Sequence, residues 1–407
     1  MPFTLKVFFY KSLMNILKVI IKFIPQPAPL LYIGENSALA LAKQIPMLGK
    51  RKVLIVTDKI LNDLGVANGI CQVLEQQGVE YAIFDAVRPD PVDTIVHQGA
   101  ELFSKQSCDC VLGLGGGSSL DAAKMIAALA NHPGKTVKQL SGILKFKRKA
   151  MPLFLVPTTA GTGSEVTAAA VITNNDNHEK MLIVDPKMMA ISAAIDPVIM
   201  QGMPAKVTAE TGVDALTHAI EAFISCHSTP TTDGNAIAAI KLIFNNLEKC
   251  YTNDGDLQAR EAVGLASTYA GLAFSHANVG YVHAIAHQLG AVYQVPHGLA
   301  NALVLPHILD YSEPNSRSRF AQLAIEIGLS KSGKTEHQLS LDFIAQVRAL
   351  IQQLNIPTTL DKLEAKDIEL LAKKALREAH YLYPVPRYLD KQACQKIIAR
   401  LLITQVS

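Results

Sequence analysis

The chain lacks several features that would point to particular classes of protein. It has no tryptophan, and its six cysteines include no Cys-x-x-Cys pair. There is therefore no sign of a thiolate metal site or a disulfide framework, and reduced thiols in a cytoplasmic protein are expected. Charged residues make up 18% of the chain, with a formal net charge of only +3 and scattered lysines. This balance gives no electrostatic footprint of nucleic-acid binding.

The N-terminal segment lacks what a membrane-spanning helix or a signal peptide needs. Residues 6–24 are mostly apolar, but they are interrupted at helical spacing by Lys11, Asn15, Lys18 and Lys22. A spanning helix needs about twenty predominantly apolar residues, and no small-residue cleavage site follows this run. Two hypotheses remain. The helix lies on an anionic membrane surface, or, as we favour, it packs on its own subunit or a partner.

The rest of the chain divides by its periodicity. Between residues 30 and 203, apolar runs of strand length alternate with helical segments, which predicts a parallel sheet covered by helices on both faces. From residue 204 onwards the strand patterns stop and successive helices follow. With 407 residues, 49% of them hydrophobic, the chain is long enough for two domains. We predict an N-terminal extension with a proline-rich link at 1–29, an α/β domain at 30–203 and an all-helical domain at 204–407.

A glycine cluster in the predicted α/β domain lies between a strand and a helix. Gly115, Gly116 and Gly117 precede Ser118, and Asp121 falls in the first turns of the helix. Backbone N–H groups at a helix N-terminus, unobstructed by side chains, form a cradle for pyrophosphate. The spacing is not GxGxxG, so the usual Rossmann fingerprint does not apply. The alternative is a tight turn without a ligand.

Two further features support a nucleotide at the carboxyl edge of the sheet. A second loop of small and hydroxyl-bearing residues, 158–164 (TTAGTGS), follows another predicted strand. Two such loops at neighbouring strand ends are typical of nucleotide binding. Asp58 ends an earlier strand, where a carboxylate accepts from a ribose 2′-hydroxyl and repels a 2′-phosphate. Its alternative role is a helix N-cap.

The predicted all-helical domain contains five residues, at regular spacings, of types that commonly bind metals in proteins. Asp214 and His218 are four residues apart, His283 and His287 repeat that spacing, and His297 follows a proline at a predicted helix start. A spacing of four places both members of a pair on one helix face. Because buried polar groups without partners are costly, such pairs are either satisfied within the core or bind a ligand. One carboxylate and three imidazoles suit a divalent metal.

Taken together, these segments resemble the iron-dependent (group III) alcohol dehydrogenases over about residues 30–400. The matching segments are, in order, IVTD, GGGSSLDAAK, PTTAGTGSEVT, GVDALTHAIEA, VHAIAHQLG and VPHGLANALVLP. The resemblance implies a Rossmann-like α/β domain followed by an all-α domain, the architecture shared with dehydroquinate synthase. The N-terminal helix is an extension beyond the family core, so the resemblance assigns it no role.

The resemblance also implies roles for individual residues. The metal, usually Fe(II) and alternatively Zn(II), would be bound by Asp214, His218, His283 and His297. His287 would line the substrate and nicotinamide pocket and relay a proton. NAD would be contacted by Asp58, Gly115, Gly116, Gly117, Ser118, Asp121, Thr158, Thr159, Thr162 and Lys180. Where family members often have a nucleotide-contacting asparagine, this chain has Asp90.

The expected activity is reversible hydride transfer between a primary alcohol or diol and NAD, which yields an aldehyde. A cytoplasmic homodimer is expected, with membrane association if the N-terminal helix lies on lipid. One alternative is a glycerol-type polyol dehydrogenase, although those enzymes usually carry Lys where this chain has Ser118. A lyase related to the sugar-phosphate cyclases would need a cluster of Lys and Arg for its anionic substrate, and no such cluster surrounds the histidines. A non-enzymatic metal- or nucleotide-binding module is the third alternative.

Overall fold

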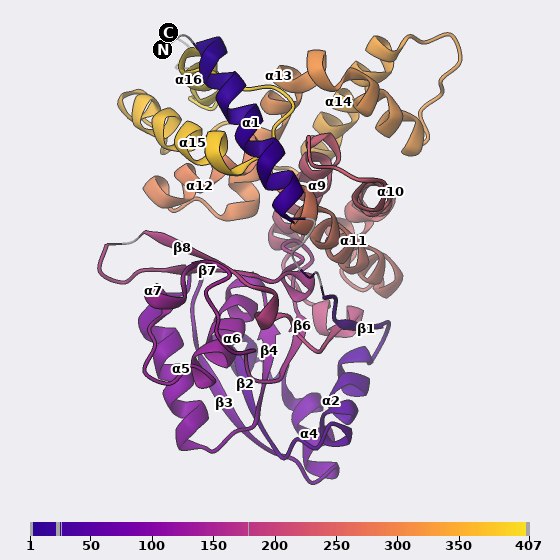
Figure 1. Ribbon diagram of the computed structural model, residues 1–407. Helices are drawn as coiled ribbons and strands as arrows, with labels where there is room; N and C mark the ends of the chain where they lie inside the picture. Colours follow the sequence, from indigo (N-terminus) through magenta and orange to yellow (C-terminus); the bar gives the residue numbers. More distant parts are fainter. Residues whose placement is uncertain (1–2, 22–24, 26, 178, 404–407) are drawn as a thin grey trace. The chain divides into compact units, whose positions relative to one another are not determined.

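The computed structural model describes residues 3–21, 25, 27–177 and 179–403, and the chain forms two compact units (Figure 1). One unit comprises Pro25–Met203 and Asp254–Thr268. The other comprises Met1–Ile24, Pro204–Asn253 and Tyr269–Ser407. The first unit therefore also includes the beginning of helix α11 (Leu257–Ala277), a contribution that the sequence pattern does not indicate.

The first unit is built on a six-stranded sheet in the order β1-β9-β6-β4-β2-β3, and every pairing in it is parallel. This confirms the predicted parallel sheet. Its strands are β1 (Leu30–Ile33), β2 (Lys52–Asp58), β3 (Glu80–Val87), β4 (Cys110–Gly115), β6 (Leu153–Pro157) and β9 (Ser192–Ile195). The strand order reverses beside β2, which has β3 on one side and β4 on the other. A reversal of this kind opens a crevice at the carboxyl ends of the strands.

Both faces of this sheet are covered by helices (Figure 1). Leu54 and Val56 of β2 belong to a core shared with α5 (Asp93–Lys105) and α6 (Gly117–Ala130). The intervening Val53 and Ile55 belong to a second core, shared with the helices α2 (Ser37–Met47) and α4 (Asn68–Gln76). Because successive side chains of a strand point to opposite faces, an apolar run such as KVLIVT fits a strand buried on both sides.

A smaller sheet was not predicted from the sequence. Its strands lie in the order β5-β8-β7 and are β5 (Gly142–Ile143), β7 (Ala169–Thr173) and β8 (Lys180–Val184). Strands β7 and β8 form an antiparallel pair. The remaining elements of this unit are short, namely α3 (Lys59–Asp63), α7 (Val137–Leu140), α8 (Pro197–Met200) and the 3₁₀ helices η1 (Ser164–Val166) and η2 (Pro186–Met188).

All the secondary-structure elements described in the second unit are helices. Its elements are α1 (Phe3–Ile21), α9 (Ala205–Ile224), α10 (Pro230–Thr252), the end of α11, α12 (Tyr281–Tyr293), α13 (His297–Glu326), α14 (Glu336–Gln353), η3 (Ala365–Asp367), α15 (Ile368–Leu382) and α16 (Lys391–Ala399). Helix α13 is kinked at Ser316, whose backbone leaves the helical region two residues after Pro314. None of the described helices is long and apolar enough to cross a membrane.

Helix α1 packs on its own unit, as favoured from the sequence. Tyr10 and Met14 are buried on its inner face. The ring of Tyr10 lies 4.7 Å from that of His380 in α15, between ring centroids. The backbone carbonyl of Met14 is 2.9 Å from Nε2 of His227, which follows α9. Residues 22–24 of the predicted amphipathic segment, Lys22 included, lie outside the described residues.

Candidate active site

Three helices of the second unit supply the predicted metal ligands. Asp214 and His218 lie one turn apart on α9, and both are almost completely buried. His283 is in the first turn of α12, which begins directly after Gly280. His297 is the first residue of α13, directly after Pro296. Each side chain is therefore placed by the direction of a helix and not by a loop.

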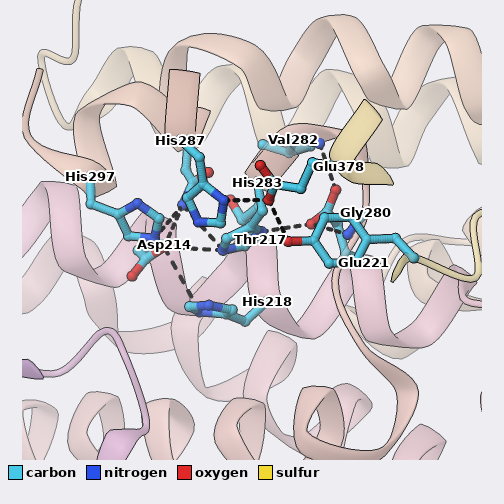
Figure 2. Close-up of polar contacts among 12 residues, drawn as sticks. Asp214, Thr217, His218, Glu221, Gly280, Val282, His283, His287, His297 and Glu378 are labelled. Atoms are coloured by element: carbon cyan, nitrogen blue, oxygen red, sulfur yellow. Dashed lines mark hydrogen bonds and ion pairs between the residues drawn. The ribbon is translucent and has the colours of Figure 1, made fainter. Parts of the chain in front are cut away.

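The four side chains converge on Oδ1 of Asp214 (Figure 2). This oxygen is 3.5 Å from Nε2 of His297, 3.7 Å from Nε2 of His283 and 3.8 Å from Nδ1 of His218. One ligand atom from each of the four residues lies within 4.8 Å of all the others. The side chain of His297 is 38% exposed, whereas the other three are buried. The cluster is thus closed by protein except near His297, and catalytic metal sites keep an open position of this kind.

A carboxylate that the sequence analysis did not single out orients this set. Glu221, one turn after His218 on α9, accepts a hydrogen bond from Nδ1 of His283 at 2.6 Å (Figure 2). It also accepts from the backbone N–H groups of Gly280 and Val282, both at 2.7 Å. Because Nδ1 of His283 is engaged in this way, its Nε2 faces Asp214. One side chain thus satisfies the N-terminus of α12 and directs a ligand of the cluster.

The buried groups of the cluster shift one another's pKa values. Burial favours the neutral form of Asp214, yet the imidazoles of His218 and His297 hold its pKa well below the usual range. Burial lowers the pKa of His218 to about 3, and its Nδ1 is buried and has no hydrogen-bond partner among the described residues. Burial also opposes the charged form of His283, but hydrogen bonds to Asp214 and Glu221 raise its pKa to about 9.

The residues present therefore fit a divalent metal. An unpartnered buried imidazole nitrogen and a buried carboxylate are costly unless a ligand satisfies both. A divalent ion would do so with one oxygen and three nitrogen donors. Fe(II) and Zn(II) both accept such a mixed set.

His287 lies beside this cluster but is held by a different partner. Its Nδ1 is 2.7 Å from Oε1 of Glu378 in α15 (Figure 2). The same carboxylate accepts from Gln288 at 3.0 Å and from the hydroxyl of Tyr383 at 2.6 Å. Burial would raise the pKa of Glu378, but the hydrogen bond and charge of His287 lower it. The ring of His287 is stacked on that of His297 and is 31% exposed, so it borders the open side of the cluster.

Except for Lys180 and Asp121, the predicted nucleotide residues lie at or just after the carboxyl ends of three adjacent strands in the first unit. Strand β4 ends at Gly115, and its neighbours β6 and β2 end at Pro157 and Asp58. Helix α6 begins at Gly117, directly after the glycine loop. The second loop follows β6, and the N–H of Thr158 donates to the carbonyl of Gly115 at 3.0 Å. The two predicted loops are thus neighbours, as the sequence analysis expected.

The glycines are required where the two loops interlock. A Cβ atom on Gly117 would lie 2.7 Å from Cγ2 of Thr162, and one on Gly116 would lie 3.3 Å from Thr159. Gly115 has a φ of +148°, which side-chain-bearing residues rarely adopt, and its Cβ would meet Ser119 at 2.6 Å. The glycines therefore let the two loops pack directly against each other at the N-terminus of α6.

Asp121 joins the two loops in this structure. Its Oδ1 accepts from the hydroxyl of Ser164 at 2.7 Å, and its Oδ2 accepts from the N–H of Val171 at 2.9 Å. Lys124, which is fully buried, donates to Ser164 at 2.6 Å, to Thr167 at 3.0 Å and to a backbone carbonyl. Burial lowers the pKa of Lys124. The polar network under the loops thus replaces the water that both charged groups have lost.

Two other predicted contacts have protein partners here. Asp58 caps helix α3, accepting from the N–H of Leu61 at 2.9 Å, which is the alternative role considered for it. Lys180, at the start of β8, forms an ion pair with Asp90 at 2.9 Å. This pair is partly exposed, so solvent weakens it. Asp90 stands where the family resemblance would place a nucleotide-contacting asparagine. In this structure it is instead the ion-pair partner of Lys180, another predicted NAD contact.

The residues missed from the sequence differ in how visible they were. Glu221 continues the spacing of Asp214 and His218, so extension of the same helix face would have found it. Glu378 gave no signal, because it lies 91 residues from His287 and only tertiary packing joins the two.

Gly298 gives a direct test of the helix packing that forms the cluster. A Cβ atom there would lie 2.3 Å from the backbone carbonyl oxygen of Glu210 on α9. We expect Gly298→Ala to push the start of α13 away from α9 and to weaken metal binding roughly tenfold or more, as loss of ligand orientation does. The measurement is metal content after dialysis against Zn(II) at limiting concentration, with circular dichroism to verify folding.

The matched control is Gly290→Ala, where the nearest atom to the added Cβ is 3.6 Å away, an ordinary contact. This variant should keep the metal content of the unaltered protein. Equal metal content in both variants would show that the close approach of α13 to α9 does not position His297.

Comparison with known proteins agrees with this geometry. Residues 28–197 match the family model described as iron-containing alcohol dehydrogenase, and residues 208–402 match the model for the C-terminal part of the Fe-containing alcohol dehydrogenase family. The chain is 37% identical to the NAD-dependent methanol dehydrogenase of Bacillus methanolicus over 358 residues, covering 88% of this chain and 93% of that protein. It is 40% identical to the 1,3-propanediol dehydrogenase of Klebsiella pneumoniae over 353 residues, covering 86% and 91%.

A solved structure of a 1,3-propanediol oxidoreductase superposes with a TM-score of 0.90 at 37% identity, covering 93% of this chain and all of that one. The first model covers the sheet and the glycine loop, and the second covers the cluster around Asp214. The chain therefore belongs to the iron-containing alcohol dehydrogenase family and is an NAD- and metal-dependent alcohol oxidoreductase.

Proposed function

We propose that this chain interconverts small primary alcohols or diols with their aldehydes, using NAD. The observation that carries the proposal is the convergence of Asp214, His218, His283 and His297 within 4.8 Å, open near His297 and His287. The two relatives whose names specify methanol and 1,3-propanediol support a small alcohol or diol as the substrate. We assign dinucleotide binding to residues 30–203 and metal binding to residues 204–407.

The residues of the second unit divide the chemistry among them. When bound, Fe(II) or Zn(II) supplies Lewis-acid stabilisation of the alcohol oxygen and NAD accepts the hydride. Asp214, His218, His283 and His297 are the proposed ligands, and Glu221 keeps Nε2 of His283 directed into the set. His287 donates from Nδ1 to Glu378, which leaves Nε2 to take up the alcohol proton and pass it to water.

The residues of the first unit hold the cofactor. We propose that the N-terminus of α6 binds the pyrophosphate, with contacts from Gly115, Gly116, Gly117, Ser118, Thr158, Thr159 and Thr162. Both oxygens of Asp121 already accept hydrogen bonds from the protein. We therefore propose that Asp121 fixes the second loop in addition to contacting NAD. Lys180 becomes available to NAD when its exposed pair with Asp90 opens.

Metal removal tests the proposed activity. The protein is stripped with a chelator and restored anaerobically with Fe(II) or Zn(II), and NADH formation is followed with methanol to butanol, 1,3-propanediol and glycerol. We expect turnover of at least one short alcohol or diol to fall about 100-fold or more in the stripped protein and to return with metal, because Lewis-acid stabilisation is worth several kcal/mol.

Activity with glycerol alone would favour the polyol dehydrogenase alternative. Binding of metal and NAD without hydride transfer to or from any member of the panel would contradict a dehydrogenase and favour the cyclase-like alternative.

Asp58 is proposed to select NAD over NADP in addition to capping α3. Asp58→Asn keeps a side-chain oxygen for the cap but removes the negative charge that repels a 2′-phosphate. We expect the ratio of kcat/KM for NADP to that for NAD to rise about tenfold or more, equivalent to ~1.4 kcal/mol, with little change in thermal stability. An unchanged ratio would leave the cap as the only function of Asp58.

We also propose a homodimer in the cytoplasm. Strand β1 is one of the two edge strands of the large sheet, and no described strand pairs with its outer edge. Leu30 and Ile33 of this strand are exposed. An edge that offers backbone hydrogen bonds and apolar side chains suits pairing with a second copy. All six cysteines are free, which fits a reducing compartment.

We further propose that the outer face of α1 makes a peripheral contact with an anionic membrane surface. Opposite the buried Tyr10 and Met14, five large apolar side chains form what we call the outer stripe, each between 52% and 70% exposed: Leu5, Phe8, Phe9, Ile16 and Val19. Their spacing places them on an arc of about 100° of the helix surface. Contiguous exposed apolar surface of this kind marks an interaction site.

The charge beside the outer stripe favours lipid as its partner. Lys6 and Lys11 are exposed on α1, and the first acidic residue of the chain is Glu35. Basic residues beside an apolar helix face are attracted to anionic headgroups by roughly 1 kcal/mol each. The other face of α1 is anchored to the protein by Tyr10, Met14 and the hydrogen bond from Lys18 to the carbonyl of Cys226.

Vesicle sedimentation tests this contact. We expect the full-length protein to bind phosphatidylglycerol-containing vesicles but not phosphatidylcholine vesicles, with binding weakened by salt. Phe8→Ser with Ile16→Ser should abolish binding and leave turnover unchanged. A control with Ile325→Ser and Leu341→Ser, exposed apolar residues elsewhere in the same unit, should bind as the unaltered protein does. Equal binding to both vesicle types, or retention by the first variant, would contradict the proposal.

A further inference from the structure

A fully buried asparagine has its side-chain amide at the centre of the ligand cluster. Asn301 follows His297 by one turn of α13 and has no solvent exposure. Its Nδ2 lies 2.6 Å from Oδ1 of Asp214, 3.2 Å from Nε2 of His297 and 3.3 Å from Nε2 of His283. The amide nitrogen thus contacts three of the four proposed ligands. It does so at the atoms that face one another within the cluster, namely Oδ1 of Asp214 and the Nε2 atoms of His283 and His297.

The orientation of the amide follows from the charge of its neighbours. An ionised carboxylate only accepts hydrogen bonds, so the nitrogen of Asn301 faces Asp214, whereas its oxygen there would be repelled. Nδ2 carries two hydrogens and lies within reach of three ligand atoms, so it cannot donate to all three at once. Its partial positive charge therefore acts as a weak counterpart of the cation that these atoms would bind.

Packing alone does not account for an asparagine at this position. Its Oδ1 is buried and forms no hydrogen bond within the part of the chain that the structure describes. A buried polar atom without a partner destabilises the folded state, and leucine has a similar shape without that cost. The amide is therefore better explained by what Nδ2 does for the ligands than by stability.

We propose that Asn301 is a positioning residue of the metal centre, which rests on the metal site of the proposed function. Its N–H groups hold Oδ1 of Asp214 at the point where the imidazoles of His283 and His297 converge. The ligand set is thereby assembled before the ion arrives, and the affinity for the ion depends on Asn301. Partners that orient ligands in this way typically affect metal affinity by about 10- to 100-fold.

The test compares metal affinity with the stability of the metal-free protein. Dissociation constants for Zn(II) and Co(II) are measured by competition with a chromophoric chelator, and unfolding temperatures are measured after metal removal. We expect Asn301→Leu to weaken binding of both metals about 10- to 100-fold. The metal-free protein should stay folded but unfold at a lower temperature, because Oδ1 of Asp214 loses a hydrogen-bond donor. A purely structural role would lower the unfolding temperature and leave both dissociation constants of the folded protein unchanged.

The control is Thr217→Val, which removes a buried hydroxyl beside His218 that bonds only to the carbonyl of Val213 in its own helix. This variant should keep both dissociation constants. If Asn301→Leu does not fold, the variant Asn301→Asp tests whether residue 301 positions the metal ligands. It places a second carboxylate against Asp214, so the metal-free protein should unfold at a lower temperature and Zn(II) should raise that temperature more than in the unaltered protein.

Dissociation constants of Asn301→Leu equal to those of the unaltered protein would overturn the inference, as would a normal unfolding temperature of metal-free Asn301→Asp where that variant decides. Failure of the unaltered protein to bind either metal would instead contradict the proposed metal site itself. The two failures are therefore distinguishable.

Discussion

The carboxylate of Glu221 is the contact on which the centre of the helical unit depends. It accepts hydrogen bonds from two backbone N–H groups at the start of α12 and from Nδ1 of His283. It therefore joins α9 to α12 and directs Nε2 of His283 towards Asp214. Gly280 leaves room for this, because a Cβ there would lie 2.8 Å from the carboxylate. Removing a partner from such a buried network leaves several polar groups unsatisfied at once, so the geometry is held cooperatively.

The nucleotide loops depend on a similar buried network. Asp121 and Lys124 lie one turn apart on the same face of α6 and hold the second loop and the following Thr167, through the hydroxyls of Ser164 and Thr167. Above them, Gly116 and Gly117 meet Thr159 and Thr162 at distances that leave no room for a side chain. Both loops are therefore fixed before a cofactor binds. A preformed cradle lowers the entropic cost of ordering loops around a ligand.

Periodicity and spacing along the chain were enough to predict the parallel sheet, the helical second half, the glycine loop and five candidate metal ligands, from which the family resemblance selected the four around Asp214. Each of these depends on local physics. A strand buried on both faces needs a continuous apolar run, and two ligands on one helix face need a spacing of three or four. Glu221 was accessible by the same argument, because it extends the face of Asp214 and His218 by one more turn.

Other features depend on residues that are distant in sequence and were decided only by tertiary packing. Glu378 holds His287 across 91 residues, and the Asn301 amide meets Asp214 across 87. The small sheet, the contribution of α11 to the first unit and the pairing of Lys180 with Asp90 are of the same kind. For α1, the sequence indicated an amphipathic helix, but only its packing showed that Tyr10 faces the protein and the outer stripe faces outward. Spacing specifies what shares one helix or strand, whereas the meeting of different elements depends on how their surfaces fit.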